Sequence, residues 1–165
     1  MLFRSGILAS AIIPLLASYK DEIVIIPLQE CHVCAVMSNN DTLAKQEFVT
    51  LEDLLHKQLL FPSSGSIIKE LVNDAFDKLG RKPNSIMDVT TIVARKVLIR
   101  DGAVSCSPSI EALWGFEPDI VMLPIKPYIK SLLALVYPAD QEISFVERAL
   151  IDILLEDYQR ESTRV

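Results

Sequence analysis

The feature that most constrains the fold of this sequence is a set of three short apolar runs that alternate with helix-like segments. Residues 59–61, 85–89 and 103–106 have the length and composition of buried strands. Between them, apolar residues recur at helical spacing over 67–79 and 92–99. Strands that alternate with helices form βαβ units, in which parallel strands share one sheet with helices on both faces. The sequence therefore predicts an α/β fold.

Capping residues mark where the helices begin and end. Thr50 and Asp53 have the spacing of a capping box, which predicts a short helix directly after them. Gly80 and Gly102 stand where the two longer helices would end in the left-handed conformation. A serine followed by proline predicts a third, short helix over residues 107–115.

The rest of the chain supplies further strands and one more helix. Ser144 and Glu147 have the capping-box spacing at the start of a final helix. Four apolar runs rich in β-branched residues predict strands, with residues 28–30 separating the first two; the runs cover residues 23–27, 32–37, 120–125 and 132–137. An apolar stripe predicts that the final helix is buried; it consists of Val146, Ala149, Leu150, Ile153 and Leu154.

The charge balance argues against nucleic-acid binding by this chain. Its 165 residues carry 22 acidic and 16 basic side chains, a formal net charge of −6, and such a surface repels phosphate groups. Half of the residues are apolar, which is enough for a well-buried core. Three cysteines cannot form a closed set of disulfides, so we expect reduced thiols and a cytoplasmic protein.

The first 18 residues resemble a weak signal peptide, with an apolar stretch after Arg4. Pro14 interrupts that stretch, and no small-residue cleavage site follows. No apolar run reaches the roughly 18 residues that a membrane-spanning helix needs. We therefore expect neither a cleaved signal nor a membrane partner.

Three loops next to predicted strands offer hydroxyl groups and helix N-termini. They cover residues 62–66, 88–91 and 105–109, and in a parallel sheet such loops meet at one edge. Free backbone N–H groups and the positive end of the helix dipole suit an anion there. Loops rich in serine and threonine favour a small carboxylate over a nucleotide. For each loop taken alone, ordinary helix capping is the competing interpretation.

A Cys-x-x-Cys motif at Cys31 and Cys34 is typical of zinc sites and redox sites. In a strand, residues three apart point to opposite faces, so these two thiols cannot share a metal or form a disulfide. A structural zinc site also needs a second ligand pair, for which only His56 and Cys106 remain. We predict two structural thiols, no metal and no cofactor.

No catalytic arrangement is visible in the sequence. It has no G-x-S-x-G elbow, no Walker loop and no G-x-G-x-x-G motif. Arg95, Lys96 and Arg100 form a basic helix face, which we interpret as solvated charge. Trp114 and Phe116 either wall a pocket or fill the end of a helix.

Six short segments stand in an order and spacing that together indicate one family. They are IIPLQE at 25–30, VMSNNDTLA at 36–44, VTLEDL at 49–54, PSSG at 62–65, LIRDG at 98–102 and LPI at 123–125. In this order they resemble the effector-binding domain of LysR-type transcriptional regulators. The resemblance covers residues 22–155.

The resemblance implies an α/β, type 2 periplasmic-binding-protein-like fold of two α/β lobes, with lobe one incomplete. It assigns residues 1–27 to a remnant of lobe one, 28–137 to lobe two, and 138–165 to a C-terminal helix that returns to lobe one. The family's winged helix-turn-helix and the first strand, helix and strand of lobe one have no counterpart in the sequence. We therefore expect a truncated chain.

The resemblance also implies which residues contact a ligand, because the family's effector lies between the lobes. From lobe two it assigns Ser63, Ser64, Gly65, Ser66 and, just behind them, Ile68. The next loop contributes Val89, Thr90 and Thr91, and lobe one contributes Leu8 and Ala9.

The implied function is a sensing domain and not an enzyme. A small anionic metabolite binds between the lobes, and in the intact homodimer or homotetramer this shifts DNA-binding domains that the sequence lacks. The alternative is an extracytoplasmic solute-binding protein of the same fold that serves a transporter. An α/β enzyme with the serine-rich loop as a phosphate cradle is a third possibility, but it lacks a plausible base.

Overall fold

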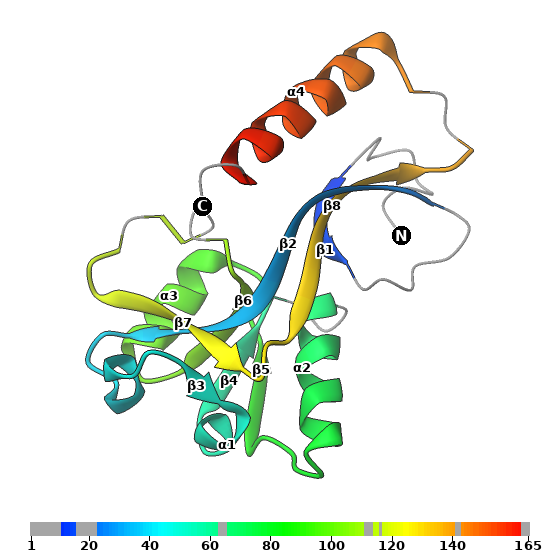
Figure 1. Ribbon diagram of the computed structural model, residues 1–165. Coiled ribbons are helices and arrows are strands. Elements are labelled where there is room, and N and C mark those ends of the chain that lie inside the picture. The colour runs from blue at the N-terminus through cyan, green and yellow to red at the C-terminus, as the bar shows by residue number, and fades with distance from the viewer. Residues whose placement is uncertain are drawn as a thin grey trace. The chain divides into compact units, whose positions relative to one another are not determined.

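Strands and helices alternate along much of the chain (Figure 1). The computed structural model describes residues 11–15, 23–62, 66–110, 114–115, 117–140 and 143–162. The strands are β1 (Ala11–Leu15), β2 (Ile23–Ser38), β3 (Val49–Thr50), β4 (Gln58–Phe61), β5 (Ser85–Asp88), β6 (Val104–Pro108), β7 (Ile120–Lys126) and β8 (Lys130–Pro138). The helices are the 3-10 helix η1 (Thr42–Lys45) and the α-helices α1 (Leu51–Leu54), α2 (Ile67–Lys78), α3 (Ile92–Arg100) and α4 (Phe145–Ser162).

The chain divides into two compact units, and both boundaries fall inside strands. One unit is Cys31–Ser131, and the other joins Met1–Glu30 to Leu132–Val165. The first boundary lies within β2, which is a single strand of 16 residues. The prediction of two strands separated by residues 28–30 is wrong, because Leu-Gln-Glu contains no turn-forming residue that would interrupt extended backbone.

The sheet of the unit 31–131 is built around β4. This strand lies between β5 and β6 and is parallel to both. The chain reaches β5 through α2 and returns to β6 through α3, which are the two predicted βαβ crossovers. β2 pairs antiparallel with β6 and also with β7, and β7 pairs in parallel with β3. The sheet is therefore mixed, with its parallel part where the sequence predicts it.

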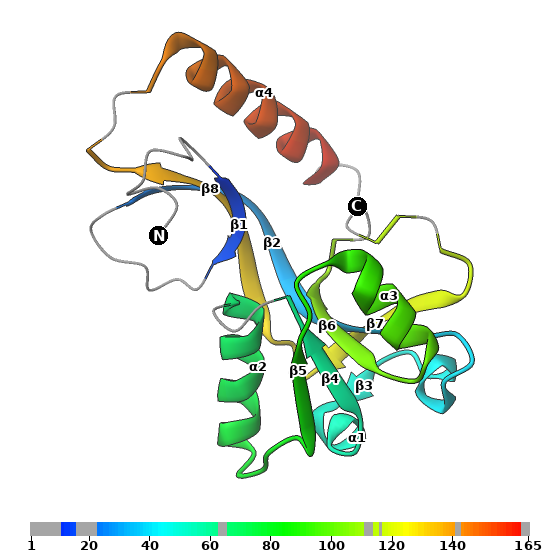
Figure 2. The ribbon, with the colours of Figure 1, turned by 180° about the vertical axis from the view of Figure 1, so that it is seen from behind.

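Helices cover both faces of this sheet. Leu59 and Phe61 of β4 belong to a buried cluster that includes Phe76 of α2. Leu60, the residue between them, belongs to a second cluster that includes Ile99 of α3. Figures 1 and 2 show α2 and α3 on opposite sides of the strands. The predicted α/β class is confirmed.

The capping residues act where the sequence places them. Thr50 Oγ1 accepts a hydrogen bond from Asp53 N at 3.2 Å, and Asp53 Oδ2 accepts one from Thr50 N at 2.8 Å, which is the capping box of α1. Gly80 and Gly102, which follow α2 and α3, have φ angles of +69° and +92°. These left-handed values are favourable for glycine and strained for other residues.

β6 continues through Ser107 and Pro108, where the sequence predicts the start of a helix. Pro108 is opposite Val33 of β2 in the antiparallel pair, and Ser109 N donates to the carbonyl of His32 at 2.8 Å. Pairing with β2 therefore outweighs the local preference of serine and proline for a helix start. Pro108 fits as the last residue of the strand because no backbone N–H is needed there for a hydrogen bond to the neighbouring strand. The predicted helix also includes residues 111–113, which lie outside the described residues.

The other unit contains β1, the adjoining parts of β2 and β8, and α4. β1 pairs antiparallel with β8, from Ala11 opposite Val136 to Leu15 opposite Leu132. β8 also pairs with β2. Among the described residues of this unit, Ala134 and Val136 of β8 are buried, each at 0% exposure.

Helix α4 has the predicted start but not the predicted burial. Ser144 N donates to Glu147 Oε2 at 2.7 Å, and Glu147 N donates to Ser144 Oγ at 3.2 Å, so the capping box is confirmed. In contrast, Val146, Leu150 and Ile153 are 75%, 46% and 59% exposed. The prediction that they are buried is wrong, because helical spacing fixes which residues share a face but not what covers that face.

Candidate functional site

The carboxyl ends of β4 and β5 lie side by side at one edge of the sheet. Phe61, the last residue of β4, is opposite Asp88, the last residue of β5. Val89 N donates to the carbonyl oxygen of Phe61 at 2.8 Å, which extends this pairing by one residue. The loops that leave these strands therefore start next to each other. One leads to the N-terminus of α2 and the other to the N-terminus of α3.

The N-terminus of α2 presents a hydroxyl group that is not used for capping. Ser66 is the N-cap residue, with extended backbone, yet its side chain makes no hydrogen bond to the first turn of α2. It is half-buried. The first N–H groups of a helix have no partner within the helix, so both they and the Ser66 hydroxyl are able to donate to an anion. Ser63, Ser64 and Gly65 precede it but lie outside the described residues.

The N-terminus of α3 is capped. Thr91 Oγ1 accepts a hydrogen bond from Ala94 N at 3.3 Å, and the Thr91 hydroxyl proton remains available to a ligand. Thr90 and Thr91 are exposed, whereas Val89 is half-buried and packs against the cluster under α3. The structure thus brings the last residues of β4 and β5 and the first turn of α2 to the same edge.

The side chains of Ile68 and of the third predicted loop are not free at this edge. The Ile68 side chain is 2% exposed and belongs to the core under α2, so only its backbone N–H faces the start of that helix. The serines of the third predicted loop are engaged inside the protein: Ser105, Ser107 and Ser109 accept hydrogen bonds from Arg95, Trp114 and His32 N, respectively. Leu8 and Ala9 fall outside the part of the chain that the structure describes.

An ion pair sets the local charge at this edge. Lys69 Nζ donates to both carboxylate oxygens of Asp88, at 2.7 and 2.8 Å. The pair links the first turn of α2 to the end of β5. Because Lys69 and Asp88 neutralise each other, the two helix N-termini supply the remaining positive potential. The sequence did not point to Lys69. It is 19 residues from Asp88, and no local pattern shows that the first turn of α2 lies beside the end of β5.

The three cysteines are buried and none is in a disulfide. Burial, and then the neighbouring Cys31, raises the pKa of Cys34 to about 12. Burial, and then Cys34, raises the pKa of Cys106 to about 12 as well. The described residues contain no group of three or more histidine, cysteine or acidic side chains placed to hold a metal. Buried thiols that stay protonated fit the structural role that the sequence suggested.

Arg95 is not the solvated charge that the sequence suggested. It is 8% exposed, its Nη1 donates to Ser105 Oγ at 3.4 Å, and its guanidinium lies 5.2 Å from the centre of the Trp114 ring. The interpretation as solvated charge was wrong for Arg95 because this residue falls between Ile92 and Ile99 on the buried side of α3. That spacing was the signal in the sequence.

The other two basic residues of α3 form ion pairs. Lys96 Nζ donates to Glu117 Oε1 at 2.7 Å, and Arg100 donates to Glu117 at 2.8 Å and to Asp119 at 2.6 Å. These partners come from the segment before β7. The basic face of α3 is therefore matched by acidic residues from the same unit.

These features define an α/β ligand-binding domain, with its candidate binding edge where parallel strands end and two helices begin. A family model described as the LysR substrate binding domain matches residues 6–159. Because this match spans nearly the whole sequence, the chain belongs to the LysR substrate-binding domain family. A comparison with curated proteins finds no match.

Solved structures of LysR regulators share the fold. The effector binding domain of QuiR in complex with shikimate is 22% identical, with a TM-score of 0.77 over 96% of this chain and 76% of that one. The CcmR regulatory domain of Synechocystis PCC6803 in complex with 2-PG is 13% identical, with a TM-score of 0.76 over 95% of this chain and 76% of that one. HinK of Pseudomonas aeruginosa, a LysR family transcriptional regulator, is 18% identical, with a TM-score of 0.77 over 95% of this chain and 56% of that one.

The likeness confirms the periplasmic-binding-protein-like fold, and family membership identifies a regulatory ligand-binding domain. Family membership favours a regulatory role over that of a solute-binding protein for a transporter. None of the helices in the described part of the chain combines the length and the apolar character that crossing a membrane requires.

Proposed function

We propose that this domain senses a small carboxylate-bearing metabolite at the edge where β4 and β5 end. The observation that carries the proposal is the pairing of Phe61 with Asp88, because the loops to the N-termini of α2 and α3 leave the sheet from these neighbouring strand ends. Two helix N-termini offer unpaired N–H groups and positive potential, which stabilise a carboxylate more than a neutral group. Membership of the LysR family supports a sensing role, and the QuiR and CcmR structures hold shikimate and 2-PG.

Each predicted residue has a role in this proposal. Ser66 donates from its hydroxyl, and Ser63, Ser64 and Gly65 provide the preceding hydroxyl and N–H groups. Thr90 and Thr91 donate from the neighbouring loop, Val89 contributes an apolar contact, and Ile68 contributes its backbone N–H. The resemblance to the family adds Leu8 and Ala9 to the proposed ligand contacts.

In the intact regulator, ligand binding would shift the balance between two conformations and so change DNA binding. We assign residues 28–137 to lobe two, with residues 1–27 and 138–165 belonging to lobe one. DNA contact falls to a separate domain, in keeping with the net charge of −6. The proposal further holds that the intact regulator is a cytoplasmic homodimer or homotetramer and that the domain catalyses no reaction. The free cysteines are compatible with the cytoplasm.

The test is a ligand screen on the full 165-residue chain by thermal unfolding and calorimetry. The panel begins with shikimate and 2-PG, continues with other small carboxylates, and pairs each with its neutral amide or ester. We expect at least one carboxylate to raise the unfolding midpoint while its neutral analogue does not. Replacing Ser64 and Ser66 together by alanine should weaken that carboxylate by about 1 to 3 kcal/mol, because charge-assisted hydrogen bonds are lost.

Ser144→Ala is the matched control, since Ser144 is also a helix N-cap but lies at the start of α4. It should leave the affinity unchanged. Neutral analogues that bind as well as the carboxylates, or an unchanged affinity in the Ser64→Ala/Ser66→Ala double variant, would place the ligand elsewhere.

A further inference from the structure

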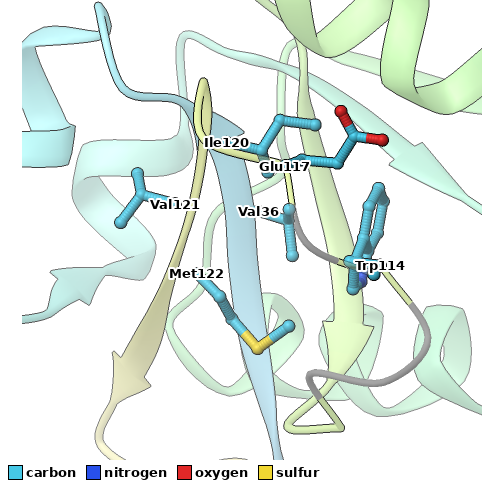
Figure 3. A pocket seen from close by; sticks show the side chains of 7 residues that line it. Val36, Trp114, Glu117, Ile120, Val121 and Met122 are labelled. Atoms are coloured by element: carbon cyan, nitrogen blue, oxygen red, sulfur yellow. The ribbon is translucent and has the colours of Figure 1, made fainter.

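The unit 31–131 has a cavity on the face of the sheet that α3 covers. Figure 3 shows it between the Trp114 ring on one side and Val36, Ile120 and Met122 on the other, with the carboxylate of Glu117 near one end. Its volume is about 360 Å³. Ligand pockets usually have volumes of roughly 300 to 1,000 Å³, so this one has room for a ligand with a single ring.

This cavity is distinct from the edge described above. Glu117 pairs with Lys96 and Arg100, which lie in the C-terminal half of α3. Thr91 of the proposed carboxylate site is the N-cap at the opposite end of the same helix. Ile120 is opposite Ser38, the last residue of β2, and β2 runs antiparallel to β6. The cavity therefore lies toward the end of the sheet opposite to the carboxyl ends of β4 and β5.

The aromatic wall of the cavity is held in place. Trp114 Nε1 donates to Ser107 Oγ at 3.0 Å, and the guanidinium of Arg95 lies 5.2 Å from the centre of the ring. Trp114 as a whole is 4% exposed. A ring fixed by a hydrogen bond and a cation–π contact loses little freedom when a ligand packs against it, which favours binding.

The opposite wall suits an aromatic ring. Val36 and Ile120 present aliphatic groups, and Met122 presents a polarisable thioether that packs favourably against ring edges. Trp114 adds a surface for stacked or edge-to-face contact. These walls together favour a planar apolar ligand.

The charges near the cavity favour an uncharged ligand. Each carboxylate oxygen of Glu117 already accepts a hydrogen bond, one from Lys96 at 2.7 Å and the other from Arg100 at 2.8 Å. A cationic ligand would compete with these two side chains and lie close to the buried Arg95. An anionic ligand would meet Glu117. We propose that this cavity binds a small, uncharged molecule with one aromatic ring.

The single tryptophan makes the proposal directly testable, because Trp114 is the only one in the chain. The probe is para-fluorobenzyl alcohol, followed by fluorine NMR and by the emission of Trp114, with para-fluorobenzylamine as a cation of the same shape. We expect saturable binding of the alcohol with a Kd on the order of 1 mM or tighter, as is typical of ligands this small. The amine should bind at least about tenfold more weakly.

Two variants locate the binding. Met122→Lys places an ammonium group in the cavity, and Ile120→Trp fills it; both residues are half-buried, and thermal unfolding checks that each variant folds. Each should reduce the affinity for the alcohol at least about tenfold. Met87→Lys is the matched control, because Met87 is 44% exposed on β5, outside the cavity, and should bind like the unmodified chain.

Three results would overturn the proposal: no saturable binding by the unmodified chain, equal binding of the alcohol and the amine, or unchanged affinity in a folded Met122→Lys or Ile120→Trp variant. None of them affects the proposed carboxylate site, which uses other residues.

Discussion

Lys69 and Asp88 set the net charge of the edge that we propose for the carboxylate. Their side chains bond at 2.7 and 2.8 Å, so the two charges compensate each other. Asp88→Asn would leave Lys69 uncompensated beside the two helix N-termini. We expect it to strengthen carboxylate binding by about three- to tenfold, while Lys69→Met weakens binding by a similar factor. Calorimetric titration with the carboxylate found in the screen measures both.

Ionic strength and an exposed lysine provide the controls for this charge effect. Raising the salt concentration should shrink both changes, because salt screens exposed charges. Lys78→Met, at the C-terminal end of α2, should have little effect. Opposite shifts for Asp88→Asn and Lys69→Met are the essential result, and shifts of the same sign would contradict the electrostatic explanation.

Cys34 and Cys106 should be chemically inert in the folded protein. Burial raises the pKa of each thiol to about 12, and the thiolate is the reactive form. At pH 8 we expect iodoacetamide to label both at least about 1,000-fold more slowly than in the unfolded chain. Mass spectrometry of labelled peptides measures the rates, and labelling of the folded protein at the unfolded rate would show that these thiols are accessible.

The same pKa shift predicts how stability changes at alkaline pH. The unfolded chain loses the thiol protons near the ordinary pKa of 9.0, whereas the folded protein retains them up to about 12. The unfolded state therefore binds fewer protons between these values, and the free energy of unfolding should fall as the pH rises from 9 toward 12. Urea unfolding over this range checks the direction.

Among the elements, the capping box of α4 gives a pH dependence of opposite sign. The hydrogen bonds from Ser144 hold the pKa of Glu147 below its ordinary value of 4.5. The cap therefore stabilises α4 above this value and is lost as the pH falls through the lowered pKa. Ser144→Ala should return the pKa of Glu147 toward 4.5, which carboxyl NMR titration measures. Thr50→Ala removes the equivalent hydroxyl of α1 and should leave Glu147 unchanged.

The elements that the sequence predicted well are those fixed by local residues. Periodicity and the glycines after α2 and α3 located both crossover helices, because capping and helical spacing act within a few residues. The length of β6 depended on a distant strand, since Pro108 is held opposite Val33. The continuity of β2 and the exposure of α4 also depend on parts far apart in the sequence. Local patterns do not contain that information.

The same distinction applies to the candidate sites. The edge at β4 and β5 was predictable because parallel strands place their carboxyl ends together whatever the side chains are. The cavity beside Trp114 was suggested only as one of two roles for that residue. Its shape depends on Arg95 and Ser107, which hold the Trp114 ring, and on Met122 of another strand, and no local pattern in the sequence joins these residues.

At the scale of the whole molecule, the described residues form their two large apolar clusters within the unit 31–131. These clusters cover the two faces of β4. Leu59, Leu60 and Phe61 are each 0% exposed. Exchange of the β4 amides therefore requires the strand to separate from β5 and β6, and this opens the core on both sides. In α4, by contrast, Phe145, Val146 and Ile153 are 86%, 75% and 59% exposed.

This difference predicts the pattern of amide hydrogen exchange across the molecule. We expect the amides of β4 to exchange at least about 100-fold more slowly than those of α4, because α4 opens locally with few buried contacts to lose. α2 is the internal reference, since it is also a helix but buries Ile68, Val72 and Phe76, and it should behave like β4. Mass spectrometry of peptides after timed labelling measures all three elements. Protection of α4 equal to that of β4 would mean that the apolar face of α4 is covered in solution. Because α2 is a helix with a covered face, the comparison with α2 distinguishes a covered face from helix formation alone.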